Sequence, residues 1–481
     1  MSLPLQPARF ATLGDTFASP VCITPLRHAR WALHSPATTA LLGIHEDQLL
    51  SESALQLCNG TAPSAIKPMA MVYSGHQFGS YNPRLGDGRA MLLGEIEHAG
   101  QRHEIQLKGA GLTPYSRQGD GRAVLRSSLR EFLCSEAMFG LGIPTTRALA
   151  LIVSDEPVYR ETQEKGAMVL RVSPSHIRFG SFEYFFYTQQ HDALQQLADF
   201  VIDHHYPECR TQAQPYAAFL ETVVQRTAKL MAHWQAVGFA HGVMNTDNMS
   251  ILGETFDYGP FGFLDDYNPR FICNHSDYSG RYAYDQQPNI GLWNCNALAH
   301  ALSPFIPIEQ LRDILQRYQP TIEQHYLHLM RDKLGLKTSV EADSALIGQL
   351  LALMQQSAVD YTIFFRRLCD FSTVQDSAPL RDLFVDRPAF DAWSAQYRAR
   401  LLQENSDEAQ RSAAMKRVNP KYILRNYLAQ QAIDLAQQND FSMAKNLLQV
   451  LLAPFDEHPS FEHYAGFPPE WGKHLEISCS S

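Results

Sequence analysis

The chain contains 481 residues with a mass of 54.2 kDa, of which 45% are hydrophobic and 19% are charged. This composition excludes a disordered chain and a small disulfide-stapled scaffold, and the length allows two or three domains or one large two-lobed core. Lys and Arg total 40 against 50 Asp and Glu, a formal net charge of -10. No overall basic field therefore attracts nucleic acid, and any bound phosphate requires a local cluster of cations.

The sequence contains neither a membrane span nor a cysteine-based metal motif. No basic leader precedes an apolar stretch, and no run approaches the roughly 20 apolar residues that cross a bilayer. We therefore expect a cytoplasmic protein with no membrane partner. The 8 cysteines contain no C-x-x-C pair, which argues against a zinc ribbon or a dense disulfide framework and favours mostly buried thiols.

Residues 68–122 are rich in glycine and short β-type runs. We expect strands at 91–96 and 103–108, joined by a turn at Gly100, because hydrophobic and polar residues alternate in the second run. The alternation places Lys108 on the face opposite the core.

Helical patterns follow these strands. From Gly121 the hydrophobic spacing is that of an amphipathic helix, with Asp120 as a possible N-cap and Glu131 in the middle of the helix. A second stripe predicts a helix over 221–237 that ends at Gly238.

The runs at 249–252 and 255–257, joined by a glycine, suggest a tight hairpin. Beyond residue 300 the patterns are almost all helical and are interrupted by Pro320. The expected helices there span 310–318, 322–334, 345–354 and 422–436. The sequence thus predicts a β-rich first part, a helical second part and a helical extension.

Two features of the first part suit a bound nucleotide. The string Gly86-Asp87-Gly88-Arg89 lets the backbone approach phosphate or ribose closely, although a short glycine loop alone is a weak signal. Lys108 on a strand followed by Glu131 on the next helix is the arrangement by which protein kinases orient a phosphate-binding lysine.

The most specific signal is HGVMNTDN at 241–248, followed by Asp-Tyr-Gly at 257–259. Asn248 lies seven residues after His241, as in the kinase loop H-x-D-x-x-x-x-N. Asn248 and Asp257 would supply oxygen ligands for Mg²⁺, a hard cation.

Position 243 does not suit kinase chemistry. Val243 stands where the catalytic Asp of a kinase would be, and a valine cannot accept a proton from a substrate hydroxyl. Either the protein is inactive, or it performs a different reaction with a different base. Asp247, beside Asn248, is the nearest candidate for that base; the alternative is a residue that stabilises the turn.

Two arginines complete the basic set. Arg171 and Arg178 could each donate paired hydrogen bonds to phosphate oxygens. Together with Lys108 they would offset much of the charge of a triphosphate.

Long and unusual strings extend over essentially the whole chain. They are YSGHQFG (73–79), LGDGRA (85–90), LKGAGLTPYSRQGDGRAVLRSSLREFL (107–133), SPSHIRFGSFEYF (173–185), GFAHGVMNTDNMSILGETFDYGPFGFLDDY (238–267) and the terminal WGKHLEISCSS. On these strings the chain resembles the selenoprotein O family, also called SelO or YdiU.

The resemblance implies a protein kinase-like, two-lobed α+β fold. It would comprise an N-terminal extension (1–67), a β-rich N-lobe (68–165), a helical C-lobe (166–300) that holds the catalytic and metal-binding loops, and a helical C-terminal extension (301–481).

The resemblance also implies a pseudokinase that binds ATP in an inverted orientation and transfers AMP to Ser, Thr or Tyr hydroxyls of proteins. Bacterial members imply possible use of UTP with Mn²⁺, hence transfer of UMP. By correspondence with the family, Asp247 is the proton acceptor, Asn248 and Asp257 hold Mg²⁺, and Glu131 pairs with Lys108. The nucleotide-binding positions are Gly86, Gly88, Arg89, Lys108, Asp120, Gly121, Arg171, Arg178 and Asp257.

The C-terminal tail departs from many animal members, because Cys479 replaces their selenocysteine. A mobile thiol there could pair with Cys273, just after the Asp-Tyr-Gly segment, and make activity redox-dependent. The alternative is a tail cysteine without a role.

Two other functions stay open at this point. A true phosphotransferase with Asp247 as its base would transfer the terminal phosphate. A nucleotide-binding scaffold would bind ATP tightly without turnover.

Overall fold

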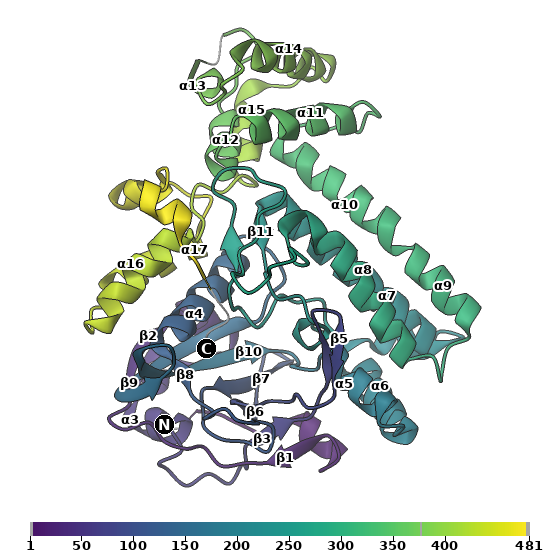
Figure 1. Ribbon diagram of the computed structural model, residues 1–481, viewed down its shortest axis with the longest axis vertical. Coiled ribbons are helices and arrows are strands. Elements are labelled where there is room, and N and C mark those ends of the chain that lie inside the picture. The colour runs from purple at the N-terminus through teal and green to yellow at the C-terminus, as the bar shows by residue number, and fades with distance from the viewer. Residues whose placement is uncertain (1–2, 376–377, 478–481) are drawn as a thin grey trace.

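The computed structural model describes residues 3–375 and 378–477. Its first part is built on an antiparallel sheet with the strand order β1-β3-β6-β7-β10-β9-β2, and the short β8 pairs with β10 (Figure 1). The strands are β1 (Ala18–Pro20), β2 (Arg30–His34), β3 (Met69–Met71), β6 (Ala90–His98), β7 (Gln101–Lys108), β8 (Ala123–Val124), β9 (Arg147–Tyr159) and β10 (Gln163–Ser173).

The strands β6 and β7 form a hairpin in the centre of this sheet. Ala90 pairs with Lys108 at its open end, and Ala99 and Gly100 form its turn with φ of 50° and 76°. Two consecutive residues with positive φ are typical of a type I′ turn, whose twist matches that of the strands. Both strands and the turn that the sequence predicts are confirmed.

The two faces of the sheet are covered differently. On one face, Ile105 and Leu107 belong to a buried cluster with the N-terminal segment that carries α1 (Pro36–Leu41), α2 (Glu46–Leu49) and α3 (Glu52–Cys58). The other face packs against α4 (Leu125–Gly140), where Lys108 reaches Glu131. The predicted orientation of Lys108, away from the core-facing side chains, is confirmed.

The helix α4 begins later than expected. Ala123 and Val124 pair with β10, so the chain is still extended there and Val124 is the N-cap residue. The prediction that Asp120 caps this helix is therefore wrong. Asp120 instead stabilises its own loop by accepting a hydrogen bond from the backbone N–H of Arg122 at 2.9 Å.

Helices dominate the middle of the chain. The predicted helix over 221–237 is confirmed as the end of a longer helix, and Gly238, with φ of 77° in the left-handed region, terminates it. The helices of this part are α5 (Phe179–Tyr187), α6 (His191–His205), α7 (Pro215–Val237), α8 (Gln287–Ala301), α9 (Ile308–Gln316) and α10 (Tyr318–Lys333).

Four short strands, arranged in two pairs, accompany these helices. The strands β4 (Gly75–Gln77) and β5 (Ser80–Asn82) form a separate hairpin, and β11 (Phe239–Ala240) pairs with β12 (Gly262–Phe263). The hairpin predicted over 249–257 is wrong. Ser250 bridges Arg178 and Thr255 bridges Thr145, so each run pairs with a segment distant in sequence and not with the other.

The predicted helical extension beyond residue 300 is confirmed, with shifted boundaries. The break falls at Arg317 and not at Pro320, because a proline in the first turn of α10 lacks an N–H that has no partner in the helix anyway. The remaining helices are α11 (Asp343–Gln356), α12 (Tyr361–Leu368), α13 (Ala378–Arg381), α14 (Arg387–Gln403), α15 (Glu408–Lys416), α16 (Asn426–Gln437) and α17 (Ser442–Leu452).

The extension has two parts in space. The helices α11 to α15 lie at one end of the molecule, whereas α16 and α17 return to pack against α4 (Figure 1). The helix expected over 422–436 begins only at Asn426. Across the described ranges, no helix is both long and apolar enough to cross a membrane.

Candidate active site

A cavity of about 1580 Å³ collects residues from the glycine loops, from β7 and β10, and from the loops around residues 245 and 257. Almost all the residues selected from the sequence line this cavity, although their positions extend over more than a third of the chain. These residues are Gly86, Gly88, Arg89, Lys108, Asp120, Gly121, Arg171, Arg178, Asp247, Asn248 and Asp257.

The lysine and glutamate expected to pair do so. Lys108 Nζ lies 2.6 Å from Glu131 Oε2, and Glu131 also accepts a hydrogen bond from Nε of Arg171. Burial lowers the pKa of Lys108 to about 8, against the opposing effect of Glu131. Burial raises the pKa of Glu131, but the charges of Arg171 and Lys108 outweigh burial and hold it below its ordinary value. Glu131 is thus an ionised bridge between the partly buried Lys108 and the buried Arg171.

Asp257 is held by both predicted arginines. Arg171 Nη2 lies 2.5 Å from Asp257 Oδ1, and Arg178 Nη1 contacts Asp257 Oδ2. Burial alone would raise the pKa of Asp257, but Arg171, Arg178 and Lys108 together hold it well below its ordinary value. Asp257 is therefore an ionised carboxylate at neutral pH, as a divalent metal ion requires of its carboxylate ligand.

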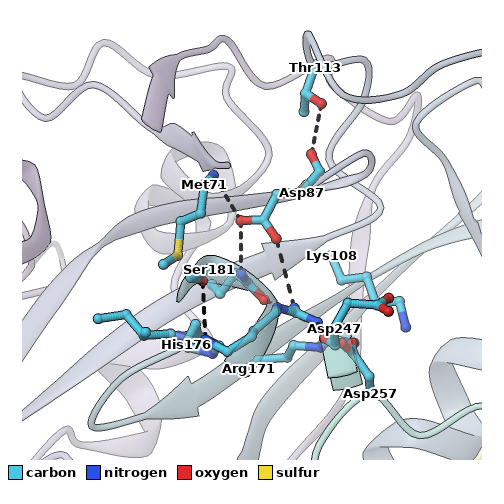
Figure 2. A network of polar contacts seen from close by, with 12 residues as sticks. Met71, Asp87, Lys108, Thr113, Arg171, His176, Ser181, Asp247 and Asp257 are labelled. Carbon is cyan, nitrogen blue, oxygen red and sulfur yellow. Dashed lines mark hydrogen bonds and ion pairs between the residues drawn. The ribbon is translucent and has the colours of Figure 1, made fainter. Parts of the chain in front are cut away.

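The sequence pattern does not single out Asp87, yet it lies at the centre of the polar network (Figure 2). Its carboxylate accepts a hydrogen bond from the Met71 N–H at 3.1 Å and faces Arg178 at 3.8 Å, while its carbonyl accepts one from Thr113 at 2.7 Å. Because Asp87 lies between Gly86 and Gly88, these contacts fix the glycine loop. The sequence analysis assigns a function to Gly86, Gly88 and Arg89 of this string, but not to Asp87.

The loop after β11 is organised around its histidine. His241 Nδ1 accepts a hydrogen bond from the Val243 N–H at 3.3 Å, so Nε2 carries the proton and donates to the Phe256 carbonyl at 2.9 Å. Asn248 Nδ2 donates to the Val243 carbonyl at 3.0 Å, which leaves the amide oxygen of Asn248 available to a ligand. The predicted metal ligands, Asn248 and Asp257, thus line the same cavity.

Asp247 is a buried carboxylate, only 7% exposed. Its Oδ2 accepts a hydrogen bond from Gln77 Nε2 at 3.3 Å, and its Oδ1 has no hydrogen-bond partner among the described residues. Burial raises the pKa of Asp247 to about 7, despite the opposing effect of Arg178. A carboxylate with these properties is suited to accept a proton near neutral pH.

Glycine is required in the loop beside Asp120. Gly121 has φ of 71°, and a Cβ atom there would lie 2.1 Å from the backbone of Gly111. Asp120 itself is partly exposed and pairs with Arg160 at 2.8 Å at the edge of the cavity.

Of the two cysteines considered for redox control, only Cys273 lies within the described residues. It is buried, and its Sγ donates to the carbonyl of Ala240 at 3.4 Å. Cys479 lies outside the described residues. The described chain ends nearby, since the His275 N–H donates to the Ile477 carbonyl at 2.9 Å and Ile477 lines the cavity. The expectation that most cysteines are buried is confirmed, Cys22 being exposed.

Comparison with known proteins settles the family. The family model described as "Protein adenylyltransferase SelO" matches residues 2–452. The chain belongs to the SelO family.

Curated members of the family align with nearly all of the chain. Two proteins named "Protein nucleotidyltransferase YdiU", from Pseudomonas paraeruginosa and Azotobacter vinelandii, are each 55% identical over 475 and 476 residues, covering 98% of both chains. A protein of the same name from Vibrio cholerae is also 55% identical, over 483 residues with the same coverage. The family assignment made from the sequence strings is therefore confirmed.

Proposed function

We propose that this SelO-family chain, a protein nucleotidyltransferase, transfers AMP from ATP to Ser, Thr or Tyr hydroxyls of proteins and releases pyrophosphate. One observation carries the choice of reaction. Val243 occupies the position of the kinase base, while the buried carboxylate of Asp247 lies in the cavity beside Asn248. This arrangement retains the means to bind a nucleotide and a metal ion and relocates the base.

We propose a kinase-like division of the molecule into two lobes, with boundaries near residues 68 and 301 and, in place of the boundary expected at 166, one after Ser173, because β10 belongs to the sheet up to that residue. The pair of Lys108 with Glu131 on the sheet side, and the cavity shared with Asn248 and Asp257 from the helical side, support this division. Residues 1–67 supply β1 and β2 and so belong to the sheet as well.

Lys108, Arg89, Arg171 and Arg178 are proposed to bind the phosphates, and the loops at Gly86, Gly88, Asp120 and Gly121 to enclose the rest of the nucleotide. In the described structure both Arg171 and Arg178 contact Asp257. Their guanidinium groups have further N–H groups, so they can bind phosphate oxygens without releasing that carboxylate.

A divalent cation, Mg²⁺ or Mn²⁺, suits Asn248 and Asp257. Within residues 3–375 and 378–477, no three His, Cys, Asp or Glu side chains are arranged to hold a metal ion. An amide oxygen and an ionised carboxylate are the small protein set typical of a cation that also binds phosphate and water. When bound, the cation would neutralise charge on the phosphates.

The residues of the chain then have separate tasks. The substrate hydroxyl oxygen attacks the α-phosphorus, the bond to the β-phosphate oxygen breaks, and the hydroxyl proton passes to Asp247. Arg171 and Arg178 stabilise the charge that develops on the departing pyrophosphate.

Three finer points stay predictions. The protein could use UTP with Mn²⁺ in place of ATP as its nucleotide substrate. It is expected in the cytoplasm. A disulfide between Cys273 and Cys479 could regulate its activity. The proximity of Ile477 to His275 supports this last proposal, because each lies two residues from one of the two cysteines.

The test is to incubate the reduced protein with ATP or UTP and Mg²⁺ or Mn²⁺, and to identify the adduct on modified peptides by mass spectrometry. We expect AMP on Ser, Thr or Tyr, no product from Asp257→Ala or after chelation of the metal, and a severe loss in Asp247→Ala. A phosphate adduct would instead indicate a kinase. Tight nucleotide binding without any adduct would indicate a scaffold, and full activity of Asp247→Ala would remove that residue from the mechanism.

A further inference from the structure

The hairpin of β4 and β5 carries most of the string YSGHQFG, to which the proposed function gives no role. It lies against the turn that contains Asp247. The backbone N–H of His76 donates to Thr246 Oγ1 at 2.7 Å, and Thr246 in turn donates to Glu183 of α5. His76 Nδ1 lies 2.5 Å from the other oxygen of Glu183. The hairpin and the turn are thus fastened to the same buried carboxylate.

The hairpin also touches Asp247 directly. A Cβ atom on Gly75 would lie 2.8 Å from Asp247 Oδ1 and 3.0 Å from its Cβ. Only a glycine allows the hairpin backbone to pass this close to the carboxylate. The side chain of Asp247 is therefore confined by backbone on the side of the hairpin.

Gln77 fixes the orientation of the Asp247 carboxylate. Its amide nitrogen donates to Asp247 Oδ2 at 3.3 Å, and its amide oxygen accepts a hydrogen bond from Asn82 Nδ2 at 3.3 Å. Asn82 therefore determines which end of the Gln77 amide faces Asp247, because an inverted amide would place two acceptors together. Asp247 Oδ1 has no hydrogen-bond partner in the described part of the chain.

We propose that Gln77 is a positioning residue for the transfer reaction. It holds Oδ2 of Asp247 while the Gly75 backbone confines Oδ1, so the carboxylate keeps one orientation for accepting the proton of the substrate hydroxyl, and Asn82 sets the orientation of the Gln77 amide. This inference rests on the proposed function, in which Asp247 is the base.

Two substitutions test the orientation of the amide. Gln77→Glu removes the donor to Oδ2, and Asn82→Asp should invert the Gln77 amide although residue 82 does not touch Asp247. The carboxylate introduced by Asn82→Asp would still accept the hydrogen bond that Asn82 Oδ1 now accepts from the Arg84 N–H at 3.1 Å. Each variant should lower kcat for AMP transfer on the order of 10- to 100-fold with an unchanged KM for ATP, since only the geometry of the base changes.

Two variants serve as controls. Ser80→Ala alters an exposed residue of the same hairpin, and Gln101→Glu adds the same charge at the exposed first residue of β7, outside the cavity. Both should keep the wild-type kcat. Wild-type kcat in Asn82→Asp and Gln77→Glu would overturn the proposal.

A double-mutant cycle separates positioning from a general structural effect. If Gln77 acts only through Asp247, Gln77→Ala lowers kcat in the wild-type background and has no further effect on the residual rate of Asp247→Ala. Equal losses in both backgrounds would overturn the proposal. Absence of AMP transfer by the wild-type protein would instead overturn the proposed function, so the two failures are distinguishable.

Discussion

The site depends on carboxylates and cations that are buried together. Glu131 bridges Lys108 and Arg171, and Arg171 continues the network to Asp257. Removing one member of such a set leaves its partners as uncompensated buried charges. Each residue of the network therefore supports both stability and the geometry of the site.

Glu131→Gln keeps the shape of the side chain and removes its charge. We expect the free energy of unfolding to fall by about 3 kcal/mol and AMP transfer to fall at least about tenfold, because Lys108 loses its orienting partner. Denaturant titration and a transfer assay measure the two effects. Glu97→Gln, in a partly exposed pair with Arg102, is the control and should change stability by less than about 1 kcal/mol. A stable, fully active Glu131→Gln would contradict this account.

At this scale the sequence predicted the residues that belong to recognisable spacings, such as Lys108 with Glu131 and Asn248 with Asp257. Gln77 could not be assigned, because 170 residues separate it from Asp247 and only the folded chain brings them together. Asp87 lies inside a string that the sequence does indicate, but nothing in its spacing shows that the carboxylate points inward to Arg178.

At the scale of elements, backbone geometry restricts which residues can occupy the loops between strands more than side-chain contacts do. Residues such as Gly121 combine a positive φ with close backbone contact. Strands and helices with a clear hydrophobic period, such as β7 and α7, were predictable. The runs at 249–252 and 255–257 were misassigned to a hairpin, because local pattern does not reveal that their partners are Arg178 and Thr145.

Two glycines with similar φ allow a matched test of how much close backbone contact at a glycine matters. Gly121→Ala should destabilise the protein by about 3 kcal/mol or more and weaken ATP binding, because its Cβ would collide with the backbone of Gly111. At Gly142, with φ of 74°, a Cβ atom would have no described atom within 4 Å, so Gly142→Ala should cost only about 1 kcal/mol. Equal losses of stability would show that close contact at Gly121 does not matter. Calorimetry of ATP binding and denaturant titration supply the measurements.

The contact between α7 and α10 should make stability dependent on pH. Nε2 of His233 and Nε2 of His325 lie 3.1 Å apart, so one nitrogen must accept a hydrogen bond and at least one of the two rings must be neutral. Burial and the charge of His325 lower the pKa of His233 to about 4, and burial also lowers the pKa of His325. The unfolded chain, with histidine pKa near 6.5, binds more protons than the folded chain between pH 6.5 and about 4. The free energy of unfolding therefore falls as the pH falls through this window.

His233→Phe should remove part of this acid sensitivity. At pH 5 we expect the variant to retain about 1 kcal/mol more of its neutral-pH stability than the wild type, after allowance for partial exposure. Urea titrations at pH 7 and pH 5 measure the difference. His474→Gln changes an exposed histidine outside α7 and α10 and should match the wild type. An unchanged acid sensitivity in His233→Phe would refute this explanation.

At the scale of the whole molecule, the C-terminal helices support the site by packing against a helix that carries one of its residues. The helices α16 and α17 pack against α4, the helix that carries Glu131 (Figure 1). Arg130 of α4 donates both to the Phe261 carbonyl, just after the Asp-Tyr-Gly segment, and to Asn426 at the start of α16. Parts of the chain almost 300 residues apart thus share one interface, a relation that no local pattern in the sequence could predict.

Arg425 joins this interface to the more distant helices. It is 2% exposed and contacts both Asp265 and Asp360, the N-cap residue of α12. Arg425→Met should lower the free energy of unfolding by about 3–5 kcal/mol, because two carboxylates lose their partner. Arg381→Met, in an exposed pair with Asp391, should cost less than about 1 kcal/mol. Denaturant titration measures both variants, and equal stability of the two would contradict the account.

The central claim is that the α-phosphate and not the γ-phosphate is transferred. The most direct measurement incubates the reduced protein with Mg²⁺ and ATP labelled at either position, and follows the label into protein with Asp257→Ala as the control. The account predicts label from the α position only, and none in the control. Incorporation from the γ position only would contradict it and identify a kinase that uses a displaced base.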